Sequence, residues 1–194
     1  MKIVFASDNQ HKLDEIRAIT PHWIEIVSLK ESGFTGELEE STGTIPGNAL
    51  QKARQVYNQL LCPCFADDSG LEVNALGGKP GVDSAHFAGP ERDSSKNIKK
   101  LLGELEGKND RSARFVTVIA FKSDQIEQLF EGEIKGIIDA TQSGTGGFGY
   151  DPVFIPEKHE ISFALMAPEL KYSMSHRTRA MQQFIGFLKD SRLN

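Results

Sequence analysis

Two long strand-like segments that lie close together in the sequence constrain the fold of this chain most strongly. Residues 114–121 and 129–138 both have the apolar pattern of long strands, and they are joined around Ser123 and Asp124. A connection this short joins antiparallel strands, because parallel strands need a crossover of a dozen residues or more. Helix-like segments occur on both sides of this pair in the sequence. We therefore expect a mixed α/β fold rather than an all-parallel sheet.

The rest of the chain alternates between strand-like and helix-like segments. We expect strands at residues 2–6, 23–29 and 63–66, the last of them buried. Apolar residues at helical spacing predict helices that cover residues 13–19, 48–60, 98–105 and 180–188. Polar or glycine-rich segments at 30–43 and 143–150 are expected to be loops. With no internal repeat or linker, residues 1–194 are expected to form a single mixed α/β domain with a sizeable sheet.

The composition is that of a soluble domain and argues against several classes of function. With 39% hydrophobic and 25% charged residues the chain can bury a full core. The net charge of −5 argues against sequence-independent binding of nucleic acid. No apolar run approaches the roughly 20 residues of a membrane span. Residues 1–7 lack the pattern of a cleavable signal, so we expect a cytoplasmic protein. Cys62 and Cys64 are expected to be reduced, without a disulfide or zinc.

Two adjacent carboxylates, Asp67 and Asp68, follow the predicted buried strand at the point where we expect it to end. Ligands of α/β folds collect beyond the carboxyl ends of sheet strands. Adjacent residues on an extended chain point to opposite sides, so one carboxylate can face a ligand while the other anchors the turn. Such a pair suits a divalent metal and a base that activates water. The alternative is a simple turn, because Asp and Ser are common where strands end.

The turn after the first strand combines Asn9 and Lys12 at the start of a predicted helix. A phosphate could bind there, because a helix N-terminus offers free N–H groups and lysine adds a point charge. Alternatively, Asp8 and Asn9 simply cap the helix.

A second polar cluster surrounds the start of the next predicted helix. Glu40 could supply a carboxylate oxygen to a metal, and Asn48 and Lys52 share one helix face. A solvated helix surface is the alternative for that face.

Two further clusters lie towards the end of the chain. Phe148, within the glycine-rich segment, could stack on a base, or it could be a core aromatic beside a tight turn. The other cluster consists of Lys171, His176 and Arg177 near the start of the last predicted helix, where arginine offers a rigid fork of donors to a carbonyl oxygen or a phosphate. His176 alone would more often be structural.

In this order, these motifs resemble the inosine triphosphate pyrophosphatase family, the RdgB-like pyrophosphatases of non-standard purine nucleoside triphosphates. The resemblance covers nearly the whole chain and rests on SDNQHK at 7–12, residues 40–52, ADDSGL at 66–71, LGGKPG at 76–81, GGFGYDP at 146–152 and SHR at 175–177. It implies a mixed, elongated sheet flanked by helices, with two lobes around a central active-site cleft, and usually a homodimer. It also implies Mg²⁺-dependent hydrolysis of ITP, dITP and XTP to the monophosphate and pyrophosphate, which prevents their incorporation into DNA and RNA.

The resemblance further implies roles for individual residues. Asp68 would be the catalytic base that activates water, assisted by Lys52, and Glu40 and Asp68 would hold Mg²⁺. Substrate would be bound by Ser7, Asp8, Asn9, Gln10, His11, Lys12, Ser69, Phe148, Gly149, Tyr150, Asp151, Lys171, His176 and Arg177. Among these, Phe148 would stack on the purine and Arg177 would donate to its 6-oxo oxygen.

A few positions depart from the family pattern, and two other functions stay open. Asp8 stands where glycine is usual, Pro46 and Gly47 replace a common acidic pair, Asn74 stands where Asp is frequent, and His86 stands where Arg is frequent. These departures bear on substrate preference and rate more than on reaction class. The alternatives are a pyrophosphatase for other modified nucleotides and a non-catalytic nucleotide-binding module. The intact Asp67–Asp68 pair and Lys52 argue against the module.

Overall fold

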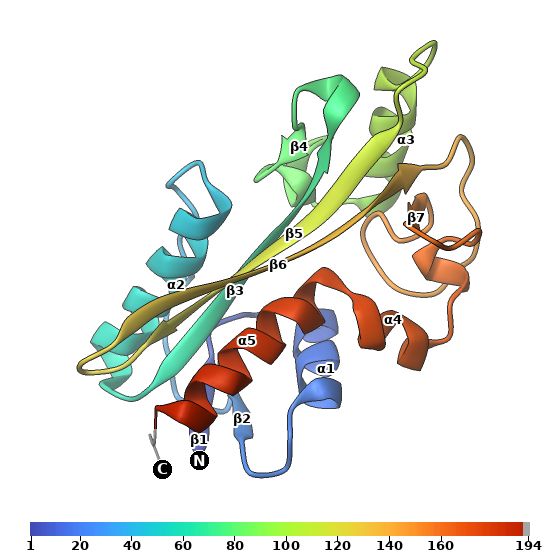
Figure 1. Ribbon diagram of the computed structural model, residues 1–194. Helices are drawn as coiled ribbons and strands as arrows, with labels where there is room; N and C mark the ends of the chain where they lie inside the picture. The colour runs from blue at the N-terminus through green and yellow to red at the C-terminus, as the bar shows by residue number, and fades with distance from the viewer. Residues whose placement is uncertain (192–194) are drawn as a thin grey trace. The chain divides into compact units, whose positions relative to one another are not determined.

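The computed structural model describes residues 1–191 (Figure 1). The chain divides into two compact units. Unit 1 consists of Met1–Asp68, Thr117–Gly132 and Arg177–Asn194, and unit 2 consists of Ser69–Val116 and Glu133–His176. The strands β3 (Cys64–Val73), β5 (Ser112–Lys122) and β6 (Glu127–Ile138) each contribute residues to both units.

Unit 1 combines its parts of these three strands with two short strands and three helices. Its other elements are β1 (Lys2–Phe5), α1 (Gln10–Ile19), β2 (Glu25–Ser28), α2 (Ile45–Leu60) and α5 (His176–Asp190), of which α5 belongs to this unit from Arg177 onwards. The strand order is β2-β1-β3-β5-β6. The strand β1 runs parallel to both neighbours, with Lys2 opposite Glu25 and Val4 opposite Cys64.

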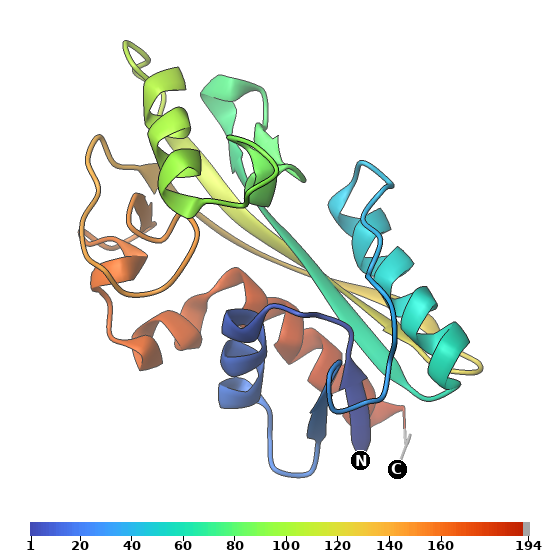
Figure 2. The same ribbon diagram turned by 180° about the vertical axis from the view of Figure 1, so that it is seen from behind.

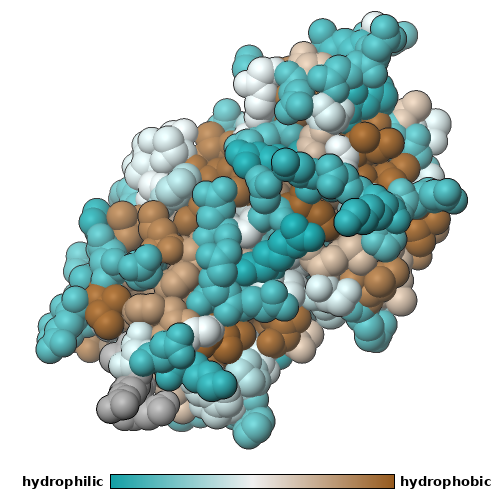
Figure 3. Space-filling model, in the orientation of Figure 1, coloured by the Kyte–Doolittle hydropathy of each residue, from teal (hydrophilic) through white to brown (hydrophobic). Residues whose placement is uncertain are grey.

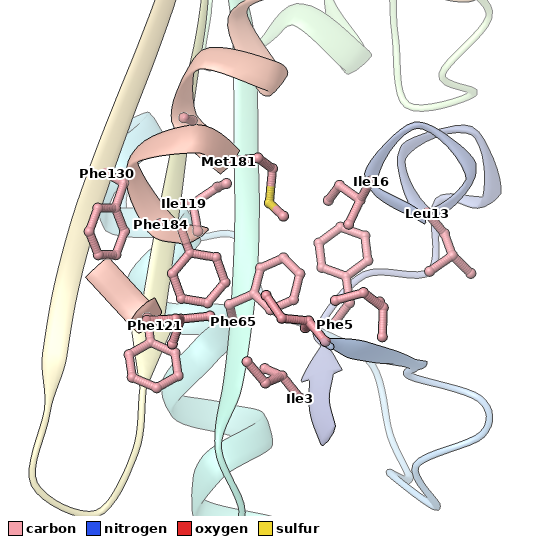
Figure 4. Packing of buried hydrophobic residues seen from close by; sticks show 14 residues of the cluster. Ile3, Phe5, Leu13, Ile16, Phe65, Ile119, Phe121, Phe130, Met181 and Phe184 are labelled. Carbon is pink, nitrogen blue, oxygen red and sulfur yellow. The ribbon is translucent and has the colours of Figure 1, made fainter. Parts of the chain in front are cut away.

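The core of unit 1 is an aromatic-rich cluster between the sheet and the helices α1 and α5 (Figure 4). The Phe65 ring of β3 lies 4.8 Å from the Phe5 ring of β1 and 5.1 Å from the Phe184 ring of α5. Leu13 and Ile16 bring one face of α1 into the same cluster. Burying side chains of this size contributes roughly 1.5–3 kcal/mol each, so this cluster fixes α1 and α5 on β3.

Unit 2 holds the remaining strand segments and the shorter elements. These are η1 (Asn74–Leu76), β4 (Pro80–Gly81), η2 (Ser84–His86), α3 (Ser94–Glu104), β7 (Phe154–Pro156), η3 (Phe163–Leu165) and α4 (Pro168–Met174). The strands β4 and β7 pair antiparallel with β3 and β6. A second buried cluster, with Phe115, Phe154 and Phe163 among its members, fills this unit.

The structure confirms the predicted mixed α/β architecture, a sheet with parallel and antiparallel pairs flanked by helices. The strands β5 and β6 are neighbours, and Ser123 N donates to the carbonyl oxygen of Ile126 across their connection (2.8 Å). One expectation is wrong: the buried strand does not end before Asp67. It continues to Val73, so both carboxylates lie inside β3.

The helix α2 begins at Ile45, three residues before its predicted start. Thr44 is its N-cap and accepts a hydrogen bond from Gly47 N (3.1 Å), and Pro46 suits the first turn because it needs no N–H partner there.

Polar residues cover much of the surface in Figure 3, with apolar residues in separate patches. Within residues 1–191, no helix is long and apolar enough to cross a membrane.

Candidate active site

Asp67 and Asp68 are neighbours in β3 but face opposite sides of the strand, because side chains alternate along a strand. Phe65 and Asp67 face α1 and α5, whereas Cys64 and Asp68 face α2. Cys64 Sγ lies 3.2 Å from the carbonyl oxygen of Ala53 in α2. Both ribbon views show α2 on one side of β3 and α1 with α5 on the other (Figures 1 and 2). The two carboxylates therefore have different ion-pair partners: Lys12 and Arg177 for Asp67, and Lys52 for Asp68.

Asp67 is fully buried in a group of ion pairs. Lys12 Nζ of α1 lies 3.1 Å from Oδ1, and Arg177 Nε of α5 lies 3.1 Å from Oδ2. Arg177 also pairs with Glu15 of α1. Burial opposes ionisation of Asp67, but the charges of Lys12 and Arg177 outweigh it and hold the pKa of this carboxyl well below its usual range. The group joins α1, β3 and α5 with two positive and two negative charges.

Asp68, on the other face, is less fully paired. Lys52 Nζ of α2 lies 3.6 Å from Asp68 Oδ1 and 2.5 Å from Glu40 Oε1. Among residues 1–191, no side chain or backbone group hydrogen-bonds to the buried Oδ2 of Asp68. Burial raises the pKa of Asp68, although the charge of Lys52 opposes the change. The Asp68 carboxylate is therefore suited to act as a general base, and its Oδ2 has no hydrogen-bond partner among the described residues.

Lys52 is buried between two carboxylates, which keeps it protonated. Burial alone would lower the pKa of this ammonium group, but the charges of Asp68, Asp67 and Glu40 raise it above the ordinary value. A buried ammonium that stays charged is a suitable partner for a phosphate group.

The residues around Asp68 fit a magnesium ion. Within the described part of the chain there is no cluster of three or more His, Cys, Asp or Glu side chains that could hold a metal by itself. Magnesium is usually held by one or two carboxylates together with water and substrate phosphates, rather than by a full protein cage. Glu40 and Asp68, both in contact with Lys52, provide two carboxylates, and Oδ2 of Asp68 is an unpartnered buried oxygen.

The turn before α1 has a capping role. Asn9 is the N-cap of α1, since its side-chain oxygen accepts a hydrogen bond from Lys12 N (3.2 Å), and Ser7 Oγ accepts one from Asn9 N (3.2 Å). Gln10 Nε2 donates to Asp14 Oδ1 (2.7 Å). Asp8 and His11 are exposed at the same turn. Ligand binding by Ser7, Asp8, Asn9, Gln10 and His11 stays a prediction, and capping by Asn9 does not oppose it.

Unit 2 contains a second group of predicted substrate-binding residues, arranged around a buried ion pair. Lys171 Nζ of α4 lies 2.7 Å from Asp151 Oδ2, which also accepts a hydrogen bond from Phe148 N (2.8 Å). The same ammonium lies 5.0 Å from the centre of the Phe148 ring and 5.7 Å from that of Phe163. A Cβ atom at Gly147 (φ +70°) would collide with the Asp151 carboxylate. Asp151 and Lys171 therefore fix the backbone that carries Phe148.

The other predicted residues of unit 2 have structural contacts of their own. Tyr150 is buried and donates a hydrogen bond from its hydroxyl to the carbonyl oxygen of Ser84 (2.9 Å), and burial raises its pKa. The His176 ring stacks on Phe115, with 4.7 Å between centroids and 11° between planes. Gly149 has φ +61°, and Ser69 is a partly buried residue of β3.

Arg177 differs from its neighbours Lys171 and His176, with which the sequence grouped it. Its guanidinium is buried in unit 1 against Asp67 and Glu15. The predicted contact with a base stays a prediction, and such a contact would have to coexist with these ion pairs or replace one.

Sequence reasoning did not identify Glu15. The signal was present, because Glu15 lies between Leu13 and Ile16 on the buried side of α1, where an unpaired charge would be costly.

The fold and this geometry define a mixed α/β protein with a carboxylate–lysine centre suited to metal-assisted chemistry on phosphates. The chain belongs to the Ham1 family, whose model matches residues 3–187. A dITP/XTP pyrophosphatase of Porphyromonas gingivalis is 48% identical, over 96% of this chain and 97% of that protein. A protein of the same name from Flavobacterium johnsoniae is 44% identical, over 97% and 98%.

Solved structures agree with this assignment. The Ham1 protein of Staphylococcus aureus superimposes with a TM-score of 0.90 at 36% identity, covering 99% of this chain and 100% of that one. A HAM1 protein from Coxiella burnetii gives 0.90 at 35% identity, with 98% and 99% covered. These similarities confirm the family resemblance and the fold class that the sequence predicts.

Proposed function

We propose that this chain hydrolyses dITP, XTP and ITP to the nucleoside monophosphate and pyrophosphate, and so keeps these nucleotides out of DNA and RNA. The enzyme class, a nucleoside triphosphate pyrophosphatase, follows from membership of the Ham1 family and from relatives named dITP/XTP pyrophosphatase over almost their full length. The observation that carries the proposal to this chain is the environment of Asp68: a buried carboxylate with an unpartnered oxygen, beside Lys52 and Glu40.

In this proposal Asp68 accepts a proton from the attacking water. Its raised pKa improves it as a proton acceptor, while the neighbouring charge of Lys52 favours its ionised form. Glu40 and Asp68 would hold Mg²⁺, which neutralises charge on the phosphates when it is bound. Lys52 and Lys12 would add positive charge, and Asp67 holds Lys12 in place by their ion pair. Positioned acid–base groups contribute about 10²–10⁴-fold to rate, so the phosphate-binding cations must supply much of the rest.

We assign recognition of the base to the residues around the Asp151–Lys171 pair. Phe148 would stack on the purine, since Asp151 and Lys171 fix its backbone and one side of its ring. A donor facing the 6-position would accept a 6-oxo purine and reject adenine, because the adenine amino group would leave that donor unpaired. Arg177 is our candidate donor. Guanine also carries a 6-oxo group, so its rejection needs a further contact.

We also propose a homodimer, which the family resemblance implies, and a cytoplasmic location, which stays a prediction from the sequence. Analytical ultracentrifugation of the purified protein would test the first.

The test is pyrophosphate release by the purified protein with Mg²⁺, measured separately from free phosphate, for dITP, XTP, ITP, GTP, ATP and dUTP. We expect strong release from dITP, XTP and ITP, little from ATP or GTP, and loss of release in Asp68→Asn. Preference for another base would make the chain a pyrophosphatase of other modified nucleotides. Tight binding without turnover would make it a non-catalytic nucleotide-binding module, and free phosphate as the first product would contradict the cleavage position.

A further inference from the structure

The segment that carries Glu40 is attached to one face of α2 by a row of amide side chains. Asn48 Oδ1 accepts hydrogen bonds from Thr42 N (3.1 Å) and Thr42 Oγ1 (2.8 Å). One turn further along the helix, Gln51 Oε1 accepts one from Ser41 N (3.0 Å). After another turn, Gln55 Oε1 accepts one from Glu39 N (2.9 Å). Three backbone N–H groups of this segment are thus bound to side chains rather than to a strand.

The row extends beyond Glu40 to the next turn of the helix. Gln59 lies against Thr35, 2.6 Å from its Oγ1. With the Gln59 amide oriented so that donors meet acceptors, its oxygen accepts from Thr35 N (3.2 Å) and its nitrogen donates to Thr35 O (3.0 Å). The four amides follow the helical spacing of three or four residues, so they occupy one face of α2.

Gln51 contacts the residues on both sides of Glu40. Its Nε2 donates to Ser41 Oγ (2.9 Å) and lies 3.3 Å from Glu39 Oε2. Glu40 itself meets Lys52, the residue next to Gln51 in α2. The hydrogen bonds of Glu39 N and Ser41 N hold the backbone on both sides of Glu40, whose side chain is 31% exposed and pairs with Lys52.

Gly47 explains why this chain can pack the segment so closely. A Cβ atom at Gly47 would collide with the hydroxyl oxygens of Thr42 and Thr44. Thr44 caps the helix and Thr42 binds Asn48, so both hydroxyls occupy the space that a larger residue would need. Gly47 is one of the positions that depart from the family pattern, and its lack of a side chain leaves room for the Thr42 and Thr44 hydroxyls.

We propose that Gln51, with Gln55 and Asn48, is a positioning residue for the metal site: it holds segment 39–42 on α2 and thereby sets Glu40 against Lys52 as a ready ligand for Mg²⁺. This inference rests on the proposed function. Residues that orient the ligands of a metal typically change metal affinity or activity by about 10–100-fold when they are replaced.

The test compares Gln51→Ala with Gln59→Ala, which removes the same kind of side chain from the same helix face but holds Thr35 instead of the neighbours of Glu40. We expect Gln51→Ala to speed hydrogen exchange at the Ser41 amide, to weaken Mn²⁺ binding measured by EPR without nucleotide, and to raise the Mg²⁺ concentration for half-maximal turnover about tenfold. The rate at saturating Mg²⁺ should change much less. Gln59→Ala should leave both metal measurements unchanged.

Three results would overturn the inference: rapid exchange of the Ser41 amide in the unmodified protein, unchanged metal dependence in Gln51→Ala, or an equal change in Gln59→Ala. Failure of the proposed function is a separate result. In that case the unmodified protein releases no pyrophosphate from dITP or XTP, while hydrogen exchange and Mn²⁺ binding still decide whether Gln51 positions Glu40.

Discussion

The variants Asp67→Asn and Asp68→Asn are expected to differ, although the two residues are adjacent. The first should lose stability, and the second should keep its stability but lose activity. Asp67→Asn removes the carboxylate that Lys12 and Arg177 share and leaves a buried excess of positive charge. Removing one partner of a buried ion pair costs about 3–5 kcal/mol. In a chain of this size 1 kcal/mol corresponds to about 2–4 °C, so the melting temperature should fall by about 6–20 °C.

Asp68→Asn should not lower stability, but it should abolish turnover. Burial raises the pKa of Asp68, which means that the folded state favours the neutral carboxyl over the charged one. Asparagine resembles the neutral carboxyl in shape and carries no charge to bury. Without the base, pyrophosphate release should fall by about 10²-fold or more.

The pH dependence of stability follows from the same two carboxyls, with opposite signs. The pKa of Asp67 is lowered on folding, so its stabilisation is present above the unfolded pKa of about 3.9 and is lost as the pH falls through the folded pKa. The pKa of Asp68 is raised, so its ionised form costs stability at neutral pH, and this cost disappears as the pH falls through the raised value. The stability difference between Asp67→Asn and the unmodified protein should therefore be largest near neutral pH and shrink in acid.

Urea unfolding at neutral and acid pH, together with pyrophosphate release from dITP, measures these effects. The reasoning is refuted if Asp68→Asn loses as much stability as Asp67→Asn, or if Asp67→Asn is as stable as the unmodified protein. Full activity in Asp68→Asn would remove that residue from catalysis.

Three other predictions can be checked separately. Gly147→Ala places a methyl group on the Asp151 carboxylate at a positive φ, so it should cost about 1–3 kcal/mol and raise KM for dITP; a neutral variant in unfolding and kinetic assays would contradict this. Burial raises the pKa of the Cys64 thiol to about 12, so iodoacetamide at pH 8 should label Cys62 first, and mass spectrometry showing equal labelling would count against it. EDTA should stop pyrophosphate release yet leave the melting temperature without nucleotide nearly unchanged, since side-chain ion pairs of Asp67 and Arg177 hold α1 and α5 on β3; a large fall would show a structural metal.

The sequence predicted the elements whose patterns are local. The helix α2 has a continuous apolar face through Ala49, Ala53 and Val56. Strand β5 is buried along most of its length, and β6 alternates between buried and more exposed residues over 130–138. The end of β3 was wrongly predicted, because Asp67 and Asp68 have the low strand propensity of turn residues. Their burial is tolerated only because lysines and an arginine from other elements compensate it, and propensity takes no account of such partners.

The candidate site was predictable in its residue types but not in its pairings. Arg177 meets Glu15 and Asp67 across 162 and 110 positions of the chain, and no local pattern encodes such distances. The opposite orientation of Asp67 and Asp68 was predictable, because it needs only an extended backbone. The attachment of segment 39–42 to α2 was not, since Gln51 looks like an ordinary surface residue until the facing N–H groups are known.

The alternation along β3 limits how the chain length can vary. Inserting or deleting a single residue between Cys64 and Asp67 would turn both carboxylates to the other face of the strand. The carboxylate beside Lys52 would then face the core of α1 and α5, and the one that anchors Arg177 would face α2. A surface loop tolerates a change of one residue, but here such a change would exchange the positions of Asp67 and Asp68. We therefore expect this stretch of β3 to keep its number of residues.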